Sequence, residues 1–406
     1  MSSNQSHVRR RNFIRDSGLL IAGGAIGSSA DGSDRNSEVE PKHSQLNVAF
    51  IGCGKRAREL ASTLLNPATK EVGNPSPEIQ IVGLADLFGS QSQSFYRSLK
   101  GRYASSITDD CSRMSGISCV DRLLDRGDID LAFVTTPPIC RPEYGEQLLS
   151  SGVHLYLEKP LAADKAGVER LVSAAQPQAD KLTIHVGFQR RYDLSYRKLI
   201  DRIHSGAIGT PLFGRTFCNV GSIRELTPDE ADSEIEHQLR NWKHFRWTGG
   251  DFLVEQHVAG LDIIRWALGE EPIAAHGEGG WTQAASHSAV DVFDHHSVDF
   301  EFASGFVCSS RCRRRSKAWN QTNEQIYGTE GRVDFSAGQL LDLNGNVIES
   351  FGAPNLKAAT QRQLLDLVDS ICSGRGANQV AEAAKSCNMA LAAQEATSSG
   401  KKFKFV

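Results

Sequence analysis

The sequence predicts an α/β protein with two domains, an N-terminal doubly wound parallel sheet and a C-terminal α+β domain with a largely antiparallel open sheet. The first prediction rests on an apolar, strand-like run at 46–51 that leads through a glycine turn into a helical pattern, and on the strand and helix patterns that alternate after it. The second rests on strand-like segments that dominate between residues 274 and 333 and are broken by a turn at 328–331. With 406 residues, the chain is long enough for both domains.

Composition excludes several classes of protein. A hydrophobic content of 40% with 23% charged residues is typical of a soluble globular chain. The net charge of −3 argues against nucleic acid as a partner, because nucleic-acid binding requires a basic face. The 9 cysteines show no CxxC spacing, and Cys308 and Cys312, four apart in an apparent strand, do not match a zinc pair. We therefore predict mostly buried thiols and no structural metal.

The first 43 residues are predicted to be a signal peptide and linker. Arg10 and Arg11 precede Phe13 and Ile14 in the twin-arginine export pattern, and the apolar run at 18–26 is too short to span a bilayer. Small residues at 28–30 then offer a cleavage site, and 31–43 form a polar linker. We expect an exported, periplasmic protein whose mature form has no membrane span; the alternative is a disordered basic tail.

The turn after the first predicted strand has the G-x-G-x-x-A spacing of a dinucleotide-binding fingerprint. Gly52 allows the tight turn, Gly54 allows close approach of a pyrophosphate, and Ala57 leaves room for the helix against the strand. The free N–H groups at the start of the helix favour phosphate. Lys55 and Arg56 either add positive charge beside that phosphate or are simply solvated. We predict a Rossmann nucleotide-binding domain over residues 44–160.

The next strand ends at a residue that selects the cofactor. Asp86 follows the predicted strand 79–85, where its carboxylate would bind the adenosine ribose hydroxyls and repel a 2′-phosphate, which favours NAD over NADP. An insert at 66–78 explains its unusual distance from the glycines. Residues 129–136 read as the fourth strand, so Thr136 and Pro137 are expected at the edge that faces the cofactor.

Glu158, Lys159 and Pro160 follow an apolar strand at 153–156, where the second domain (161–406) would begin. Proline fixes its own φ and pushes the preceding residue toward extended geometry, so the backbone aims the Lys159 ammonium group. Glu158 and Lys159 are expected beside the cofactor. The alternatives for Lys159 are a surface turn or a salt bridge to Glu158 or Glu255.

The second half supplies candidate substrate-binding residues. Arg190 and Tyr192 follow the predicted strand 182–188, where they either bind substrate hydroxyls or cap the loop. Trp242 either stacks on a sugar ring or fills the core. A terminal helix at 377–398 is expected to return and pack near the domain junction.

The segment after Gly249 and Gly250 is predicted to be helical. Glu255, Ala259 and Asp262 then share one face, at i, i+4 and i+7, and His257 points about 160° away from Glu255. Histidine titrates near neutral pH and suits proton transfer, whereas lysine can act as a base when burial or cations lower its pKa. A core or interdomain hydrogen bond is the alternative for His257.

These motifs together resemble the Gfo/Idh/MocA oxidoreductases over residues 45–406. The resemblance implies a Rossmann domain, a second domain with an open sheet, hydride transfer between a nicotinamide and a sugar or polyol carbon, and Lys159 close to both. It also implies homo-oligomers. The family's Asp and His positions in the helix after the glycines are occupied here by Glu255 and Ala259. In the exported subgroup a histidine at the position of His257 is usual, so the catalytic candidates are Lys159, His257 and Glu255.

Three functions remain open. The leading one is an NAD(P)-dependent oxidoreductase that acts on a sugar or polyol hydroxyl and holds NAD tightly. The second is an NAD-dependent glycoside hydrolase that acts through a transient keto sugar. The third, motivated by Ala259, is a catalytically inactive nucleotide-binding protein.

Two polar clusters receive other interpretations. Asp294, His295 and His296 offer metal ligands, but neighbouring strand residues point to opposite faces, so we predict no metal. The basic run 311–315 either attracts an acidic sugar or forms a solvated edge.

Overall fold

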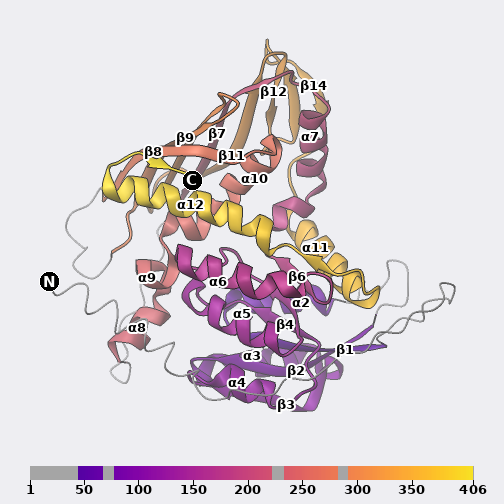
Figure 1. Ribbon diagram of the computed structural model, residues 1–406. Helices are drawn as coiled ribbons and strands as arrows, with labels where there is room; N and C mark the ends of the chain where they lie inside the picture. The colour runs from indigo at the N-terminus through magenta and orange to yellow at the C-terminus, as the bar shows by residue number, and fades with distance from the viewer. Residues whose placement is uncertain (1–43, 67–76, 222–232, 282–290, 406) are drawn as a thin grey trace.

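The computed structural model describes residues 44–66, 77–221, 233–281 and 291–405, which form two stacked layers of sheet and helix (Figure 1). A parallel sheet with helices on both faces makes the first domain, and a larger sheet with helices on one face makes the second. The predicted signal peptide and linker, 1–43, and most of the predicted insert at 66–78 lie outside the described residues.

The first sheet has seven strands, all parallel, in the order β15-β6-β5-β4-β1-β2-β3. Its central strand β4 is apolar and buried along its whole length because helices cover both faces, which confirms the predicted doubly wound α/β class. The strands are β1 (Gln45–Ile51), β2 (Glu78–Asp86), β3 (Ile107–Ser115), β4 (Leu131–Val134), β5 (His154–Leu157), β6 (Thr183–Val186) and β15 (Ala377–Asn378).

Alternate side chains of this sheet enter two different cores, as the pleat of a strand requires. Phe50 of β1 stacks on Phe133 of β4, with ring centroids 4.7 Å apart, in the core on one face, whereas Ile51 enters the core on the other. The helices of the first core are α2 (Lys55–Leu64), α3 (Gly89–Arg102) and α11 (Leu356–Cys372). Those of the second are α4 (Cys119–Leu124), α5 (Arg141–Ser150) and α6 (Lys165–Ala175).

The predicted domain boundary at residue 160 falls inside this sheet rather than at its end. β6 pairs in parallel with β5, where Leu155 lies opposite Ile184, and β15 then pairs with β6. The terminal helix therefore begins later than predicted: residues 377–378 form the edge strand, and α12 runs over Val380–Ser399. The C-terminal residues complete the N-terminal domain.

The second sheet has nine strands in the order β14-β13-β12-β11-β7-β10-β9-β8-β16. Only β7 and β10 pair in parallel, so the prediction of a largely antiparallel sheet is confirmed. The strands are β7 (Pro211–Val220), β8 (Pro272–Gly280), β9 (His295–Phe302), β10 (Val307–Arg314), β11 (Gln321–Gly328), β12 (Gly331–Asp334), β13 (Gln339–Asp342), β14 (Val347–Ser350) and β16 (Phe403–Lys404).

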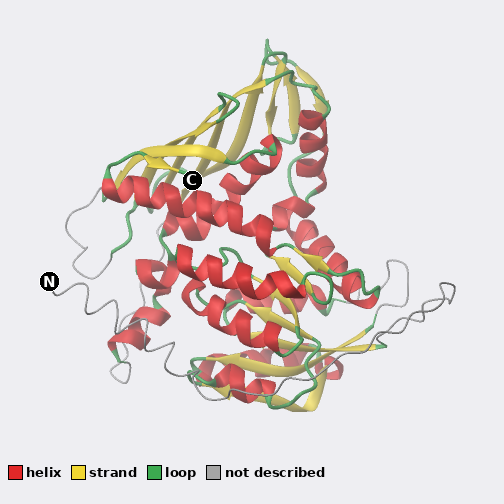
Figure 2. Ribbon diagram, in the orientation of Figure 1, coloured by secondary structure: helices red, strands yellow, loops and turns green. Residues whose placement is uncertain are grey.

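Three helices accompany this sheet. Figure 2 shows α10 (Val258–Leu268) and α12 beneath it and α7 (Leu194–His204) at its side. Leu261 and Ile264 of α10 are fully buried in the same core as Phe300 of β9 and Ile326 of β11. One face of the sheet is thereby covered, and the opposite face carries exposed apolar side chains such as Phe213 and Val307.

α12 joins the two domains, as the sequence predicted. It packs between β8 of the second sheet and α6 of the first domain (Figure 1). The Cys387 thiol accepts a hydrogen bond from the main-chain N–H of Leu161, immediately after the Lys159-Pro160 peptide bond, which is cis. Although α12 is 20 residues long, neither it nor another described helix is long and apolar enough to cross a membrane.

A segment of the second domain, residues 233–249, crosses to the first domain, and we call it the crossing segment. It consists of α8 (Glu234–Arg240), a 3₁₀ turn (Trp242–His244) and α9 (Arg246–Gly249). A capping box between Ser233 and Glu236 starts α8. The Arg240 guanidinium group at its end lies 3.7 Å from the ring centroid of Phe88, just past β2. This contact brings the two domains together over one cleft.

Candidate active site

The cleft lies at the carboxyl ends of the parallel strands and consists of two adjoining pockets that share Gly54, Thr135 and Trp242. The first pocket, about 790 Å³ with its open mouth, is lined chiefly by the loops after β1, β2 and β4 and by the crossing segment. The second, about 1500 Å³ measured in the same way, extends between the domains past Lys159. Ligands of doubly wound sheets bind at this edge.

The glycine turn has the geometry that a phosphate site requires. Gly52 adopts a φ of +85°, and a Cβ placed there would lie 2.8 Å from the main-chain nitrogen of Thr136. Gly54 immediately precedes α2, and a Cβ there would meet no atom within 4 Å, so its position opens on the cleft. Ala57 is fully buried behind the turn. The N-terminus of α2 therefore presents N–H groups to a space that a diphosphate fits.

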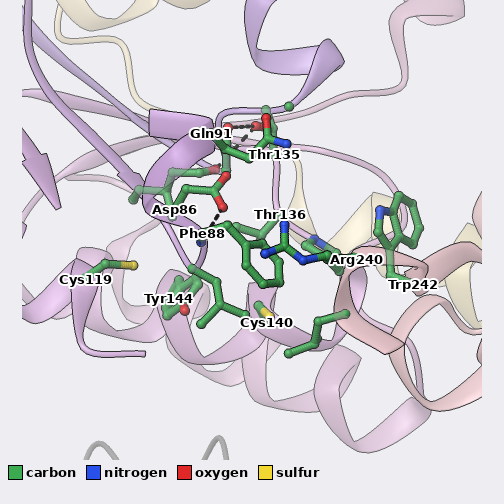
Figure 3. A pocket seen from close by; sticks show the side chains of 16 residues that line it. Asp86, Phe88, Gln91, Cys119, Thr135, Thr136, Cys140, Tyr144, Arg240 and Trp242 are labelled. Carbon is green, nitrogen blue, oxygen red and sulfur yellow. Dashed lines mark hydrogen bonds between the residues drawn. The ribbon is translucent and has the colours of Figure 1, made fainter. Parts of the chain in front are cut away.

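Asp86 lies at the end of β2 with its carboxylate in the first pocket (Figure 3). One oxygen accepts from the main-chain nitrogen of Cys53 at 2.7 Å and the other from that of Phe88 at 2.9 Å. Burial raises the pKa of Asp86, and these two N–H groups partly offset the effect. Because each carboxylate oxygen accepts more than one hydrogen bond, both remain able to bind a pair of ribose hydroxyls.

Thr136 and Pro137 also line the first pocket, after β4. The Thr136 hydroxyl oxygen is buried and finds no hydrogen-bond partner among the described residues. A buried hydroxyl without a partner costs free energy unless a ligand satisfies it. Together with the glycine turn and Asp86, it fits a dinucleotide.

Lys55 and Arg56 differ in their surroundings. The Lys55 side chain is solvent-exposed at the pocket rim, 3.8 Å from Glu59. Arg56 instead donates to the Glu158 carboxylate at 2.6 Å and to Gln189 at 2.8 Å. Glu158 is 6% exposed, so Arg56 neutralises a buried carboxylate in the wall of the second pocket.

Lys159 lines the second pocket, and its side-chain nitrogen donates to the main-chain carbonyl oxygen of Glu255 at 2.5 Å. Burial lowers the pKa of Lys159, and the opposing effect of the Glu255 and Glu158 charges does not cancel it. Arg141 holds the adjacent backbone, since its guanidinium group donates to the carbonyl oxygens of Glu158 at 2.9 Å and Pro160. The salt bridge to Glu158 or to Glu255 that the sequence left as the alternative is not present.

Glu255 is a carboxylate held between cations. Lys243 lies 3.4 Å from one oxygen and Arg314 3.2 Å from the other. Burial would raise the pKa of Glu255, but the charges of Lys159, Lys243 and Arg314 outweigh it and the pKa is lowered. No local pattern in the sequence marks Lys243 as a site residue, and Arg314 stands out only as part of the basic run 311–315.

The predicted helix face holds for Glu255 and Ala259 but not for Asp262, because residues Leu253–His257 form a π-helical turn before α10. A π turn contains an extra residue and rotates every side chain that follows it. Glu255 and Ala259 line the second pocket together with Gln256. Asp262 is buried elsewhere, where it accepts from Arg191 at 2.8 Å and from Ser386 at 2.6 Å.

His257, one of the two candidates for the group that takes the substrate proton, lines neither described pocket. Its side chain is 1% exposed, and Nε2 lies 2.8 Å from the Ser310 hydroxyl of β10. Burial, aided by the charge of Arg190, lowers the pKa of His257 to about 3. It is a neutral core histidine, which is the alternative that the sequence left open.

Of the predicted substrate-binding residues, Trp242 lines both pockets and Arg190 lines the second. The Arg190 guanidinium group is already bound to Glu324 at 2.6 Å. Tyr192 is misassigned, because its hydroxyl is 3.1 Å from Asp366 of α11 and 2.7 Å from Gln379, the N-cap residue of α12. It ties helices to the first sheet and reaches neither pocket.

The predicted histidine cluster is divided between two environments. His295 lies 2.7 Å from Asp294, whereas His296 is buried and lies 3.0 Å from Asp251. Within the described ranges, no group of three or more His, Cys, Asp or Glu side chains is arranged to hold a metal ion.

Comparison with known proteins places this architecture in one family. The oxidoreductase family with an NAD-binding Rossmann fold matches residues 46–188, and the GFO/IDH/MocA C-terminal domain matches residues 196–334. Inositol 2-dehydrogenase of Ralstonia nicotianae is 32% identical over 138 residues, which are 34% of this chain and 40% of that relative. The sequence match therefore spans less than half the length of that relative.

Two solved structures share the fold of both domains. Myo-inositol 2-dehydrogenase from Lactobacillus plantarum superposes with a TM-score of 0.69 at 20% identity, over 89% of this chain and 100% of that one. Aldose-aldose oxidoreductase from Caulobacter crescentus, complexed with glycerol, gives 0.68 at 19%, over 89% and 100%. With a nucleotide-binding turn, a Lys159-centred cleft and both domain matches, the chain belongs to the Gfo/Idh/MocA oxidoreductase family.

Proposed function

We propose that the protein is an NAD-dependent oxidoreductase that moves a hydride to or from a hydroxyl-bearing carbon of a sugar or polyol. The observation that carries the proposal is the position of Lys159 in the second pocket, which adjoins the dinucleotide-like first pocket through Gly54, Thr135 and Trp242. The relatives named inositol 2-dehydrogenase and aldose-aldose oxidoreductase support polyols and sugars as the substrate class.

The residues of the first pocket would hold NAD, which when bound supplies a nicotinamide ring that accepts or donates the hydride. The turn at Gly54 and the start of α2 would bind its diphosphate, and Asp86 its adenosine ribose. The Asp86 carboxylate repels a 2′-phosphate, which favours NAD over NADP. The Thr136 hydroxyl would gain the partner that it lacks among the described residues.

We assign Lys159 as the general base that accepts the proton of the substrate hydroxyl. Its lowered pKa increases the share of neutral amine, which accepts a proton from the substrate hydroxyl while the hydride departs. In the opposite direction its ammonium form polarises the carbonyl oxygen. His257 is buried away from the cleft, and Ala259, which lines the second pocket, offers no proton acceptor. Lys159 therefore carries the acid–base step without a histidine.

We also propose that NAD stays bound between turnovers. Leu239, Arg240 and Trp242 of the crossing segment line the first pocket, so a nucleotide there would be enclosed by both domains. A retained nucleotide suits the predicted twin-arginine export, which carries folded proteins, since free NAD is scarce outside the cytoplasm. The cofactor would then be recycled by a second sugar.

Homo-oligomers remain part of this proposal. Phe213 of β7 and Val307 of β10 lie opposite each other in the sheet, and both are exposed on its uncovered face. Exposed apolar side chains that adjoin in this way favour a protein interface. Light scattering on the purified protein measures the oligomer directly.

The test begins with protein purified without added cofactor. Denaturation should release about one NAD(H) per chain, identified by mass and absorbance, because one turn and one ribose-binding aspartate form one site. Sugars and polyols are then screened for reduction of bound NAD. In Lys159→Met the rate should fall by about 10³-fold, the size expected for loss of an acid–base group, while nucleotide content is retained.

The control is Lys165→Met, which removes a solvent-exposed lysine at the start of α6 and should change neither quantity. A protein without nucleotide that also fails to bind added NAD contradicts the proposal. Cleavage of a glycoside with no net consumption of NAD would indicate the hydrolase instead.

A further inference from the structure

We propose that the substrate carries a carboxylate, as a hexuronic or aldonic acid does, and that Lys243 binds it. The inference rests on the proposed function, since it names the class of sugar that the second pocket takes. It comes from the distribution of charge around that pocket.

Cations outnumber carboxylates there. Arg190 and Lys55 are each offset by a glutamate, Glu324 and Glu59. The remaining charges that line the pocket are four cations and two carboxylates, an excess of two positive charges, contributed by Arg56, Arg141, Lys159 and Lys243 against Glu158 and Glu255.

Both of these carboxylates, Glu158 and Glu255, already have cationic partners. Glu158 accepts from Arg56, and Glu255 is shared by Lys243 and Arg314. Lys159 and Arg141 donate only to main-chain carbonyl oxygens among the described residues. Cations removed from water without an opposite charge are costly, and the low pKa of Arg141, about 10 because of burial, reflects that cost.

The cofactor does not supply the missing negative charge at Lys243. Its diphosphate belongs at the glycine turn, beside Lys55 and Arg56, whereas Lys243 and Arg314 come from the second domain around Glu255. An oxidised nicotinamide, when bound, would add a further positive charge to the cleft. An anionic group on the substrate balances the charge on this side of the cleft.

Lys243 is the cation near Glu255 that an anionic group on the substrate can contact. Its side chain is 32% exposed and lines the second pocket, while Arg314 is 8% exposed and lies behind Glu255. At 3.4 Å, its contact with Glu255 leaves the three-donor ammonium group free to bind a second acceptor. Trp242 beside it and the exposed Gln256 offer a ring surface and an amide donor to a sugar in the pocket that Lys159 also lines.

A carboxylate fits better than a phosphate. Phosphate sites favour arginine forks and helix N-termini. The arginines that line the second pocket are engaged, Arg56 with Glu158, Arg141 with main-chain oxygens and Arg190 with Glu324. A single accessible lysine with a neighbouring amide suits one carboxylate.

The experiment compares matched substrates on the NAD-containing protein: glucose with glucuronate, galactose with galacturonate, and glucose 6-phosphate. We expect kcat/KM for a uronate to exceed that of its neutral partner by at least about 10-fold, the gain of one charge-assisted hydrogen bond. Lys243→Met should lower this ratio by about 10- to 100-fold. Lys243→Arg should restore most of it, and Lys165→Met should leave it unchanged.

Equal or better turnover of the neutral sugars, or a ratio that Lys243→Met does not change, overturns the inference while the oxidoreductase stands. Turnover of the phosphate ester but not of the uronates overturns it as well. If no sugar is oxidised, the proposed function fails, and the inference is judged by binding: glucuronate should raise the melting temperature of the wild-type protein and not that of Lys243→Met. The absence of any shift with glucuronate overturns it.

Discussion

The side-chain nitrogen of Lys159 lies 2.5 Å from the main-chain carbonyl oxygen of Glu255, and among the described residues it forms no ion pair with a carboxylate. This hydrogen bond joins the end of the first sheet to the π-helical turn of the second domain. It holds the amine in the cleft without neutralising its charge. The electrostatics of the Glu255 side chain therefore act on Lys159 through space.

Replacing Glu255 with glutamine should make Lys159 more acidic. The Glu255 charge raises the pKa of Lys159 against the effect of burial, so its removal lowers that pKa further. Because the proposed oxidation needs the neutral amine, the rise of kcat/KM with pH should move to lower pH. Stability should fall by about 3 kcal/mol, since the buried Arg314 and the partly exposed Lys243 lose their partner.

The matched control is Glu169→Gln, which breaks an exposed pair with Lys165 and should cost less than about 0.5 kcal/mol. A profile that moves to higher pH, or that does not move, contradicts the coupling between Glu255 and Lys159.

The two glycines of the turn should respond differently to alanine. Gly52→Ala places a Cβ 2.8 Å from a backbone nitrogen at a positive φ, so we expect a loss of about 1–3 kcal/mol of stability. Gly54→Ala meets no atom within 4 Å and should fold normally, but its methyl group intrudes on the space for a diphosphate and weakens NAD binding. Denaturant unfolding and nucleotide titration separate the two effects, and equal stability losses would contradict this assignment.

Acid should destabilise the protein through His257. Folding lowers its pKa from 6.5 to about 3, so the folded state resists protonation while the unfolded state accepts it. Above pH 6.5 the imidazole is neutral in both states and the unfolding free energy does not depend on it. Below pH 6.5 the unfolded state binds a proton that the folded state does not, so the unfolding free energy falls, by about 2 kcal/mol at pH 5.

The measurement is unfolding free energy at pH 7 and pH 5 for the wild type and for His257→Gln, which keeps a polar group near Ser310. The variant should lose less stability between the two pH values. An identical loss in both proteins would show that other groups govern the acid response.

Asp86 should control the choice of nucleotide. Asp86→Ser removes the charge that repels a 2′-phosphate, and Arg240, above Phe88 in the same pocket, is then able to attract one. We expect the preference for NAD over NADP to fall by about 10- to 100-fold, measured as a ratio of dissociation constants. A preference that does not change would assign the selection to another residue.

The local patterns of the sequence predicted more of the fold than of the site. Three motifs are each made of residues that are neighbours in the chain: the apolar run before Gly52, the strand that ends at Asp86, and the lysine between an apolar strand and Pro160. Backbone stereochemistry acts over these distances, so spacing alone was informative. The same reasoning predicted alternating strands and helices first and a largely antiparallel sheet later, and both are present.

The sequence did not predict that residues near the C-terminus would complete the parallel sheet. β15 is two residues long and has no periodicity, and its pairing with β6 depends on where α11 and α12 place it. The predicted boundary at residue 160 consequently cut the sheet. A two-residue edge strand cannot be predicted from local sequence, because it is defined only by its pairing with a neighbouring strand.

The sequence by itself determined the nucleotide turn, Asp86 and Lys159, because each is held by its immediate neighbours. Only the tertiary structure decided that Lys243 and Arg314 meet at Glu255, and that His257 is buried against Ser310. Those contacts join elements far apart in the chain, and one π-helical turn, which hydrophobic periodicity does not reveal, sets which side chains face the cleft. The charge around the proposed substrate therefore depends on packing between elements that are distant in the sequence.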